Sequence, residues 1–328
     1  NNLSVYIIND KVDYNISKYE FDIVKANYKN RFLMMLELIQ YINRCHFDVI
    51  ISFTRMTNIY LGLIKPFINR DIKLIGFKQN LLNEIYTFSF FKKYIFLKLY
   101  QVSVKRLDLM IANSVDTKNN IFKENIIAKR TIVLPNPALE NDYQLKEITP
   151  ASHRFLSEMN FTFIMVGRLV PQKGYFTALK LFEKSLKFNP DYRLLILGVG
   201  PQRNALAEYS KELGIYNKVD FLGFKQNVFE YMKAAKGLLL TSEWEGFGNV
   251  IIESISLGTP VLAINCIGGP KEILINNLIG RLAKDEAHFL SLLNDRNNFV
   301  RSSSEKDEMI KAMSKYTPEN LIDKYELL

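Results

Sequence analysis

Apolar runs with the character of buried strands alternate along the C-terminal half of the chain with segments that have helical spacing. Three such runs occupy residues 161–166, 193–197 and 237–241. The segment after the first run has apolar positions at helical spacing that we expect to pack on a sheet: Phe176, Leu179, Phe182 and Leu186. Repeated strand and helix patterns of this kind predict an α/β fold built on parallel sheets.

The N-terminal half shows the same alternation more weakly, with strand patterns at 47–53, 107–112 and 131–134. At 328 residues, 48% of them hydrophobic, the chain is long enough for two α/β domains with sizeable cores. The most polar connector runs from residue 138 to 153, and we place the domain boundary there. The prediction is an N-terminal domain at 1–140, a C-terminal domain at 141–316 and a terminal helix at 317–328.

Positive charge is concentrated in the N-terminal half of the chain. The chain carries a net charge of +9, and residues 1–140 contain 20 Lys and Arg against 12 Asp and Glu. Within this half, aromatic and aliphatic side chains alternate with lysines over a probable helix at 88–106. Such a helix could lie on an anionic membrane surface, or it could be a core helix with a solvated cationic face. Nucleic-acid binding is a poorer explanation, because no nucleic-acid motif accompanies the charge.

The cysteines and the longest apolar runs restrict the location of the protein. Cys45 and Cys266 fall in different predicted domains and provide neither a disulfide framework nor a metal-ligand cluster. No apolar run approaches the roughly 20 residues needed to span a bilayer. We therefore expect a cytoplasmic protein, either free or peripheral at the inner face of the plasma membrane.

The strongest chemical signal is a pair of acids, Glu245 and Glu253, on either side of a glycine-rich loop and a helix start. The loop follows the apolar run at 237–241, and Gly248 or Asn249 would cap the helix, so that Glu253 lies about one turn inside it. A helix start offers unpaired N–H groups that suit a phosphate. Alternatively, Glu253 only complements the helix dipole and Glu245 is a solvated loop acid.

A second signal is the cation pair Arg168 and Lys173, in the loop after the predicted strand at 161–167. Ligands of open α/β sheets bind at the carboxyl ends of strands, where this loop lies. Arginine offers a planar fork for phosphate oxygens, and lysine offers a point charge. Alone, the two residues would be ordinary surface cations.

Together these motifs resemble those of family 4 glycosyltransferases: Glu, seven residues, Glu at 245–253, and Gly-Arg, four residues, Lys-Gly at 167–174. Segments 219–224 and 268–274 resemble the same family more weakly, in the same order. The resemblance implies a GT-B fold, in which two Rossmann-like domains face a cleft and the terminal helix crosses back to the N-terminal domain.

The resemblance also implies an activity. It predicts a retaining hexosyltransferase or N-acetylhexosaminyltransferase that moves a sugar from a nucleotide diphosphate donor, UDP-linked in preference to GDP-linked, to a glycan or lipid-linked acceptor. The setting would be bacterial surface polysaccharide synthesis, such as lipopolysaccharide or capsule. The nucleotide sugar is a substrate, so no cofactor is expected, and no metal is expected either.

Residue roles follow from the same resemblance. The catalytic set is Arg168 and Lys173, which would stabilise the departing diphosphate, and Glu245, which would bind hydroxyls of the donor sugar. Glu253 would bind the ribose. The remaining donor-binding candidates are Gly167, Phe224, Gly246, Phe247, Gly248, Asn249 and Val250. Phe224 could equally be a core residue.

Two departures from the family pattern leave other functions open. Residues 1–9 align best with the second strand of the family, so roughly one β-α unit of about 30 residues is expected to be missing. Where some relatives use a histidine near the reacting sugar, this chain has Lys78, and none of its three histidines, His46, His153 and His288, has a catalytic context. A sugar-nucleotide epimerase, or an inactive member that binds a nucleotide sugar, are the alternatives.

Overall fold

The computed structural model describes residues 3–8, 22–28, 30–81, 89–139 and 148–326. The described chain forms two compact units. The first consists of residues up to Lys78, 82–111 and 121–132, and the second of Gln79–Leu81, Ala112–Asn120 and Val133–Leu328. Residues 140–147, half of the predicted interdomain connector at 138–153, lie outside the described residues. The α/β architecture expected from the sequence is confirmed in both units.

The second unit is built on a six-stranded parallel sheet with the order β12-β11-β10-β7-β8-β9. Its strands are β7 (Phe161–Val166), β8 (Tyr192–Leu197), β9 (Val219–Gly223), β10 (Gly237–Leu240), β11 (Val261–Ile264) and β12 (Gly280–Ala283). From β7 the chain adds β8 and β9 on one side and then returns to add β10, β11 and β12 on the other. The order therefore reverses between β7 and β10, which pair through Gly237 opposite Phe163.

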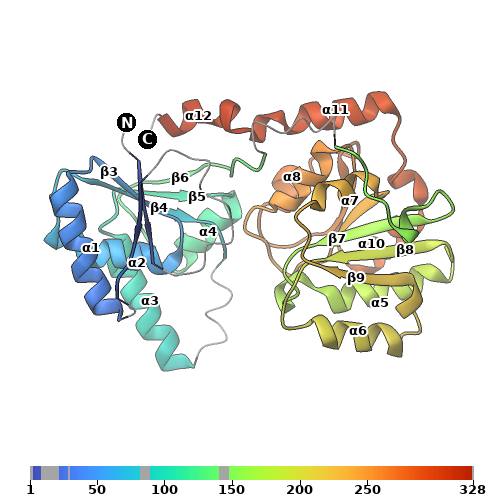
Figure 1. Ribbon diagram of the computed structural model, residues 1–328, viewed down its shortest axis with the longest axis horizontal. Coiled ribbons are helices and arrows are strands. Elements are labelled where there is room, and N and C mark those ends of the chain that lie inside the picture. The colour runs from blue at the N-terminus through green and yellow to red at the C-terminus, as the bar shows by residue number, and fades with distance from the viewer. Residues whose placement is uncertain (1–2, 9–21, 29, 82–88, 140–147, 327–328) are drawn as a thin grey trace. The chain divides into compact units, whose positions relative to one another are not determined.

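Helices cover both faces of this sheet (Figure 1). One face is covered by α7 (Val228–Ala234), α8 (Asn249–Ser256), α9 (Pro270–Ile273) and α11 (Ser303–Met313), whose apolar side chains form one buried cluster with the strands. The other face is covered by α5 (Tyr175–Leu186), α6 (Arg203–Glu212) and α10 (Glu286–Asn294), which form a second cluster. α12 (Pro318–Glu326) ends the described chain.

One predicted core position in α5 is wrong. Leu179 and Phe182 are fully buried against the sheet and Leu186 is partly buried there, as expected. Phe176 remains 37% exposed, and its ring lies 5.3 Å from the ring of Tyr209 in α6. Phe176 therefore contacts the neighbouring helix instead of the sheet, because it lies on the same face of α5 as the exposed Lys180, whereas Tyr175 in the same turn is buried.

The first unit contains a four-stranded sheet in the order β3-β4-β5-β6 and a separate parallel pair, β1 and β2. The strands are β1 (Ser4–Ile7), β2 (Asp22–Lys25), β3 (Val49–Ser52), β4 (Lys73–Lys78), β5 (Leu109–Ala112) and β6 (Thr131–Val133). The helices of this unit are α1 (Arg31–Cys45), α2 (Arg55–Ile64) and α3 (Phe90–Val104). α4 (Val115–Lys123) is divided between the units, with residues up to Asn120 in the second and the rest in the first. No helix in the described ranges is both long enough and apolar enough to cross a membrane.

Candidate functional site

The reversal of strand order in the second unit defines where a ligand can bind. Neighbouring parallel strands whose connections leave in opposite directions open a crevice at their carboxyl ends. In this sheet those strands are β7 and β10. The loop 167–174 follows β7, and the loop 241–248 follows β10. Both predicted motifs thus lie at the switch point of one sheet, although about 70 residues separate them in the sequence.

Three hydrogen bonds hold these two loops together. The Thr241 hydroxyl donates to the Gly174 carbonyl at 2.9 Å. The Glu243 amide donates to the Gln172 carbonyl at 2.9 Å, and the Gln172 side chain donates to the Trp244 carbonyl at 2.9 Å. Gly174 has a φ of +63°, and a Cβ there would lie 2.0 Å from the Thr241 carbonyl oxygen. Only glycine allows this approach.

Lys173 and Glu245 form an ion pair across the two loops. The Nζ of Lys173 lies 2.6 Å from Oε1 of Glu245, and their side chains are only 17% and 7% exposed. The Ser242 hydroxyl donates to the same carboxylate oxygen at 2.6 Å. A Cβ on Gly167 would lie 3.4 Å from Cε of Lys173, so the lysine side chain passes directly over this glycine. The ammonium group is therefore fixed at the carboxyl end of β7.

Glu253 lies in the second turn of α8, about one turn inside the helix as predicted, and of the two predicted cap residues Gly248 is the N-cap. Gly248 adopts a φ of +93°, which lets the chain turn into the helix. Burial raises the pKa of the Glu253 carboxyl to about 7, and the nearby charge of Lys173 opposes this shift. Glu253 is therefore partly protonated near neutral pH, and Lys173 lies close enough to affect both predicted acids.

The remaining loop residues differ in what they can offer a ligand. Arg168 is exposed and forms no ion pair with any residue of the described ranges. Gly246 is buried, Asn249 is exposed and Val250 is half-buried at the start of α8. Phe247 is buried, and its ring packs edge-on against Tyr316 at 5.5 Å. Any contact from Phe247 to a ligand would therefore come from its backbone.

Phe224 follows β9, two strands from β7 along the same edge of the sheet. The Gly198 amide at the end of β8 donates to the Gly223 carbonyl at 2.8 Å, which joins the ends of these strands. Phe224 is 71% exposed, so the alternative that it is a core residue is wrong. Its ring is not in contact with the Lys173–Glu245 pair but has an exposed face at the same edge.

Structure adds residues that the sequence reasoning missed. Gln172 lies inside the 167–174 motif and Ser242 lies three residues before Glu245, so their positions offered a signal. Gln172 joins the two loops, and Ser242 hydrogen-bonds to the ion pair. Tyr175 is buried and donates to the Gly167 carbonyl at 3.0 Å. Burial raises the pKa of the Cys266 thiol to about 12, with Glu245 also raising it, which places a neutral thiol beside the carboxylate. No pattern in the sequence indicated Cys266.

The family comparison is consistent with this geometry. Residues 150–316, which contain both loops, match the model of the family described as "Glycosyl transferases group 1". The chain belongs to this family. Among the described residues of this glycosyltransferase, no group of three or more His, Cys, Asp or Glu side chains is arranged to hold a metal ion.

Three relatives of this group 1 glycosyltransferase illustrate the range of similarity. An uncharacterized glycosyltransferase of Methanocaldococcus jannaschii is 32% identical over 64% of this chain and 52% of its own length. A lipopolysaccharide 1,6-galactosyltransferase of Salmonella typhimurium is 30% identical over 53% of this chain and 48% of its own length. An N-acetylgalactosaminyltransferase of Campylobacter jejuni that acts on a diphospho-undecaprenol acceptor is 23% identical over 85% and 76%. The chain thus spans about half the length of the first two relatives.

Solved structures share the fold over nearly the whole chain. The lipopolysaccharide outer core galactosyltransferase WaaB aligns with a TM-score of 0.70 at 20% identity, covering 97% of this chain and 86% of WaaB. HepE of Anabaena, solved in complex with UDP-glucose, aligns with a TM-score of 0.73 at 18% identity, covering 94% and 86%. WaaG, from lipopolysaccharide biosynthesis, aligns with a TM-score of 0.72 at 16% identity, covering 99% and 90%.

Proposed function

We propose that this group 1 glycosyltransferase transfers a sugar from a nucleotide diphosphate donor to a glycan or lipid-linked acceptor in bacterial surface glycan synthesis. The observation that carries the proposal is the buried Lys173–Glu245 pair, placed at the switch point of the sheet with Glu253 in the adjoining helix. A cation beside two acids offers one group for a phosphate and two for hydroxyls. This combination matches the chemistry of a nucleotide sugar.

In the proposed reaction, the bond between the anomeric carbon and the diphosphate breaks, and the acceptor hydroxyl oxygen bonds to that carbon. The hydroxyl proton passes to an oxygen of the diphosphate, and the configuration of the sugar is retained. Negative charge grows on the diphosphate as it leaves. Lys173, fixed by Glu245, and the exposed Arg168 stabilise this charge. Fixed countercharges at a leaving group are among the strongest contributions to catalysis.

The other residues bind the donor. Glu245 accepts hydrogen bonds from hydroxyls of the donor sugar through the oxygen that does not hold Lys173. Glu253 accepts from the ribose, and Phe224 stacks on the base. Amides at the start of α8, around Gly248, Asn249 and Val250, contact phosphate oxygens. The countercharge comes from two side chains, so the proposal includes no metal ion and no cofactor.

The donor is proposed to be a UDP-sugar, with a hexose or N-acetylhexosamine as the transferred group. HepE, which shares the fold, was solved with UDP-glucose, and the relatives include a galactosyltransferase and an N-acetylgalactosaminyltransferase. The names of these relatives support both kinds of sugar equally.

The acceptor side of the proposal involves a membrane surface. The first half of α3 exposes large apolar side chains, with Phe90 87% and Phe91 73% exposed, beside Lys92, Lys93 and Lys98. A core helix would bury these rings. Aromatic side chains beside lysines suit the boundary between lipid head groups and acyl chains. We therefore propose that the protein works in the cytoplasm, peripherally at the inner face of the plasma membrane.

A nucleotide-binding experiment tests the donor site. Thermal unfolding is followed with UDP, GDP, ADP and NAD, on the wild type and on Glu253→Ala and Arg168→Ala. A ligand at 100 times its Kd adds about 2.7 kcal/mol to the native state. Selective stabilisation by UDP that both variants lose supports the proposal. Stabilisation by NAD alone, or equal stabilisation of both variants, contradicts it, and product analysis with a UDP-sugar separates transfer from epimerisation.

A further inference from the structure

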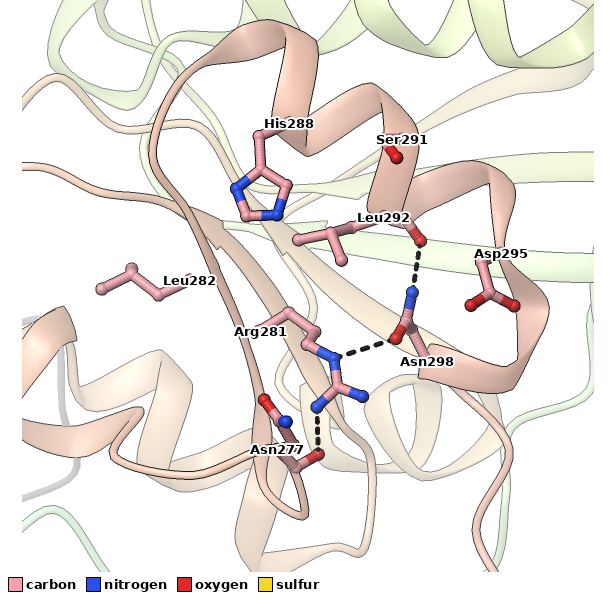
Figure 2. Close-up of a pocket in the computed structure, with 8 residues that line it drawn as sticks. All are labelled: Asn277, Arg281, Leu282, His288, Ser291, Leu292, Asp295 and Asn298. Carbon is pink, nitrogen blue, oxygen red and sulfur yellow. Dashed lines mark hydrogen bonds between the residues drawn. The ribbon is translucent and has the colours of Figure 1, made fainter.

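A hollow lies on the outer edge of the sheet in the second unit, away from the loops that follow β7 and β10. It has a volume of about 410 Å³, within the range of small-molecule sites, and it is formed by β12, the loop before it and α10 (Figure 2). β12 is an edge strand, so this side of it has no neighbouring strand. The proposed donor site uses none of the residues that line the hollow.

Arg281 is held rigidly in this pocket. Its Nε donates to Oδ1 of Asn298 at 2.9 Å, and its Nη1 donates to the Asn277 carbonyl at 2.9 Å. Asn298 is buried and is itself fixed, because its Nδ2 donates to the Leu292 carbonyl at 2.9 Å. Figure 2 shows this chain of hydrogen bonds from α10 to the guanidinium. Two of the five guanidinium N–H groups are used, and the planar fork is preorganised.

A second guanidinium lies next to it. Nη2 of Arg301 donates at 2.9 Å to the same Asn277 carbonyl oxygen that accepts from Arg281. Burial lowers the pKa of Arg301, and the charge of Arg281 lowers it further. Neither arginine forms an ion pair with a carboxylate in the described part of the chain. Two cations therefore share one neutral acceptor, and the nearby charge of Glu305 opposes the shift in the pKa of Arg301.

The rim adds further donors and an apolar surface. Nδ1 of His288 accepts from the Lys284 amide at 3.3 Å, which leaves Nε2 as the free ring nitrogen. Ser291 contributes a hydroxyl, and Leu282 and Leu292 contribute apolar surface. The one carboxylate in the lining belongs to Asp295, whose Oδ1 accepts from the Asn297 amide at 3.1 Å and so caps the short helix that follows α10.

We propose that this pocket binds a phosphate group, carried either as the free ion or as an ester of a hexose-sized molecule. The Arg281 fork binds the phosphate oxygens, with Arg301 behind it adding to the positive potential. Arginine is the side chain that best matches two oxygens of a phosphate at once. His288 and Ser291 supply further hydrogen bonds, and the two leucines cover the C–H face of a sugar ring. This site is separate from the donor site and does not depend on its assignment.

The test measures thermal unfolding and calorimetric binding with inorganic phosphate, glucose 6-phosphate and glucose, at constant ionic strength, with and without saturating UDP. A matched pair of variants changes one exposed rim position: Ser291→Glu places a carboxylate opposite the fork, and Ser291→Gln has the same size without charge. Arg281→Gln removes the fork, and Lys284→Ala serves as a control outside the lining. Circular dichroism establishes that each variant is folded.

We expect phosphate or glucose 6-phosphate to bind the wild type, Ser291→Gln and Lys284→Ala, and to bind Ser291→Glu and Arg281→Gln at least tenfold more weakly. Tighter binding of glucose 6-phosphate than of phosphate identifies the ester as the ligand, and equal binding identifies the free ion. The proposal is wrong if neither compound binds, if glucose binds as well as its phosphate, or if Ser291→Glu binds unchanged. Saturating UDP should leave these affinities unchanged. A negative result for this pocket would therefore not contradict the proposed donor site.

Discussion

The Nζ of Lys173 lies 2.6 Å from Oε1 of Glu245, and this ion pair joins two loops that follow neighbouring strands of one sheet. The pair is almost buried, so each partner depends on the other for compensation of its charge. In the proposed mechanism Lys173 also stabilises the departing diphosphate. Stability and catalysis therefore depend on the same contact, and mutagenesis can separate them.

Replacement of Lys173 by Met should lower both stability and turnover. The substitution leaves the Glu245 carboxylate buried without its cation, which should lower the free energy of unfolding by about 3 kcal/mol. Adding Glu245→Gln removes the uncompensated charge, so the double variant should recover much of the melting temperature and none of the activity. We expect turnover to fall at least about 100-fold in both. A double variant that regains activity together with stability would assign Lys173 a structural role only.

Replacement of Arg168 by Ala should reduce turnover without reducing stability. The side chain is exposed and has no ion-pair partner in the described ranges, so the free energy of unfolding should change by less than about 0.5 kcal/mol. Turnover should fall by about 100-fold or more. Lys180→Ala, which removes an exposed cation from α5, is the matched control and should retain full activity. Equal activity of the two variants would contradict the catalytic assignment.

Glu253 makes stability depend on pH in a defined window. Folding raises its pKa from 4.5 to about 7, so between these values the native state binds more protons than the unfolded state. Stability of the wild type should therefore fall as pH rises from about 4.5 to about 7, by roughly 3 kcal/mol at most. Glu253→Gln lacks this titration. The difference between the melting temperature of Glu253→Gln and that of the wild type should therefore increase as pH rises from about 4.5 to about 7, and it should stay constant above this range.

The same substitution should weaken nucleotide binding, because the proposed ribose contact requires a carboxylate that accepts two hydrogen bonds. Wild-type affinity for UDP should increase as pH rises through about 7, and the affinity of Glu253→Gln should not. Calorimetric titrations at pH 6 and pH 8 measure the difference. If both proteins respond to pH in the same way, another group controls binding.

Phe224→Ala should weaken UDP binding by about 1 kcal/mol, the lower end of the range for stacking of an aromatic side chain on a base. The ring is 71% exposed, so stability should change little. Phe188→Ala is a close control, because Phe188 is 72% exposed and lies just beyond the C-terminal end of α5, away from the loops of the candidate site. Binding should be normal in the control. A loss of equal size in both variants would exclude stacking.

The exposed face of α3 should bind anionic vesicles. Replacing Phe90 and Phe91 by Ser, or Lys92 and Lys93 by Glu, should each lower the fraction that cosediments with phosphatidylglycerol vesicles by about tenfold. The wild type should not bind neutral phosphatidylcholine vesicles to the same extent. Binding that survives both double substitutions would place the membrane contact on another surface.

Most residues of the candidate site could be named from the sequence, because they are concentrated in two short motifs. The start of α8 at Gly248 or Asn249, and Glu253 about one turn inside the helix, follow from local spacing alone. The direct ion pair between Lys173 and Glu245 could not be predicted from the residues, since it depends on which strand lies beside β7. Sequence order favours β8 as a neighbour, and only the return of the chain to β10 brings the two loops together.

Burial explains the remaining differences. Phe247 lies between two candidate ligand-contacting residues, Gly246 and Gly248, yet its side chain belongs to the core, where it packs against Tyr316. Phe224 is also a phenylalanine next to a glycine, but it is exposed, because it follows the last strand on its side of the sheet. The burial of Phe247 and the exposure of Phe224 both depend on tertiary structure and not on the neighbouring sequence. Cys266 and the Arg281 pocket likewise depend on tertiary neighbours, which no motif specifies.

The joining of β7 to β10 also determines when the donor site can form during folding. Lys173 and Glu245 are 72 residues apart, and each half of the sheet carries only one of them. A folding intermediate in which only one half of the sheet is assembled positions either the cation or the acids, so it cannot bind the donor. Closure of such a long connection is slow relative to local helix formation. Nucleotide binding should therefore appear late in refolding, and it can serve as a reporter of the completed sheet.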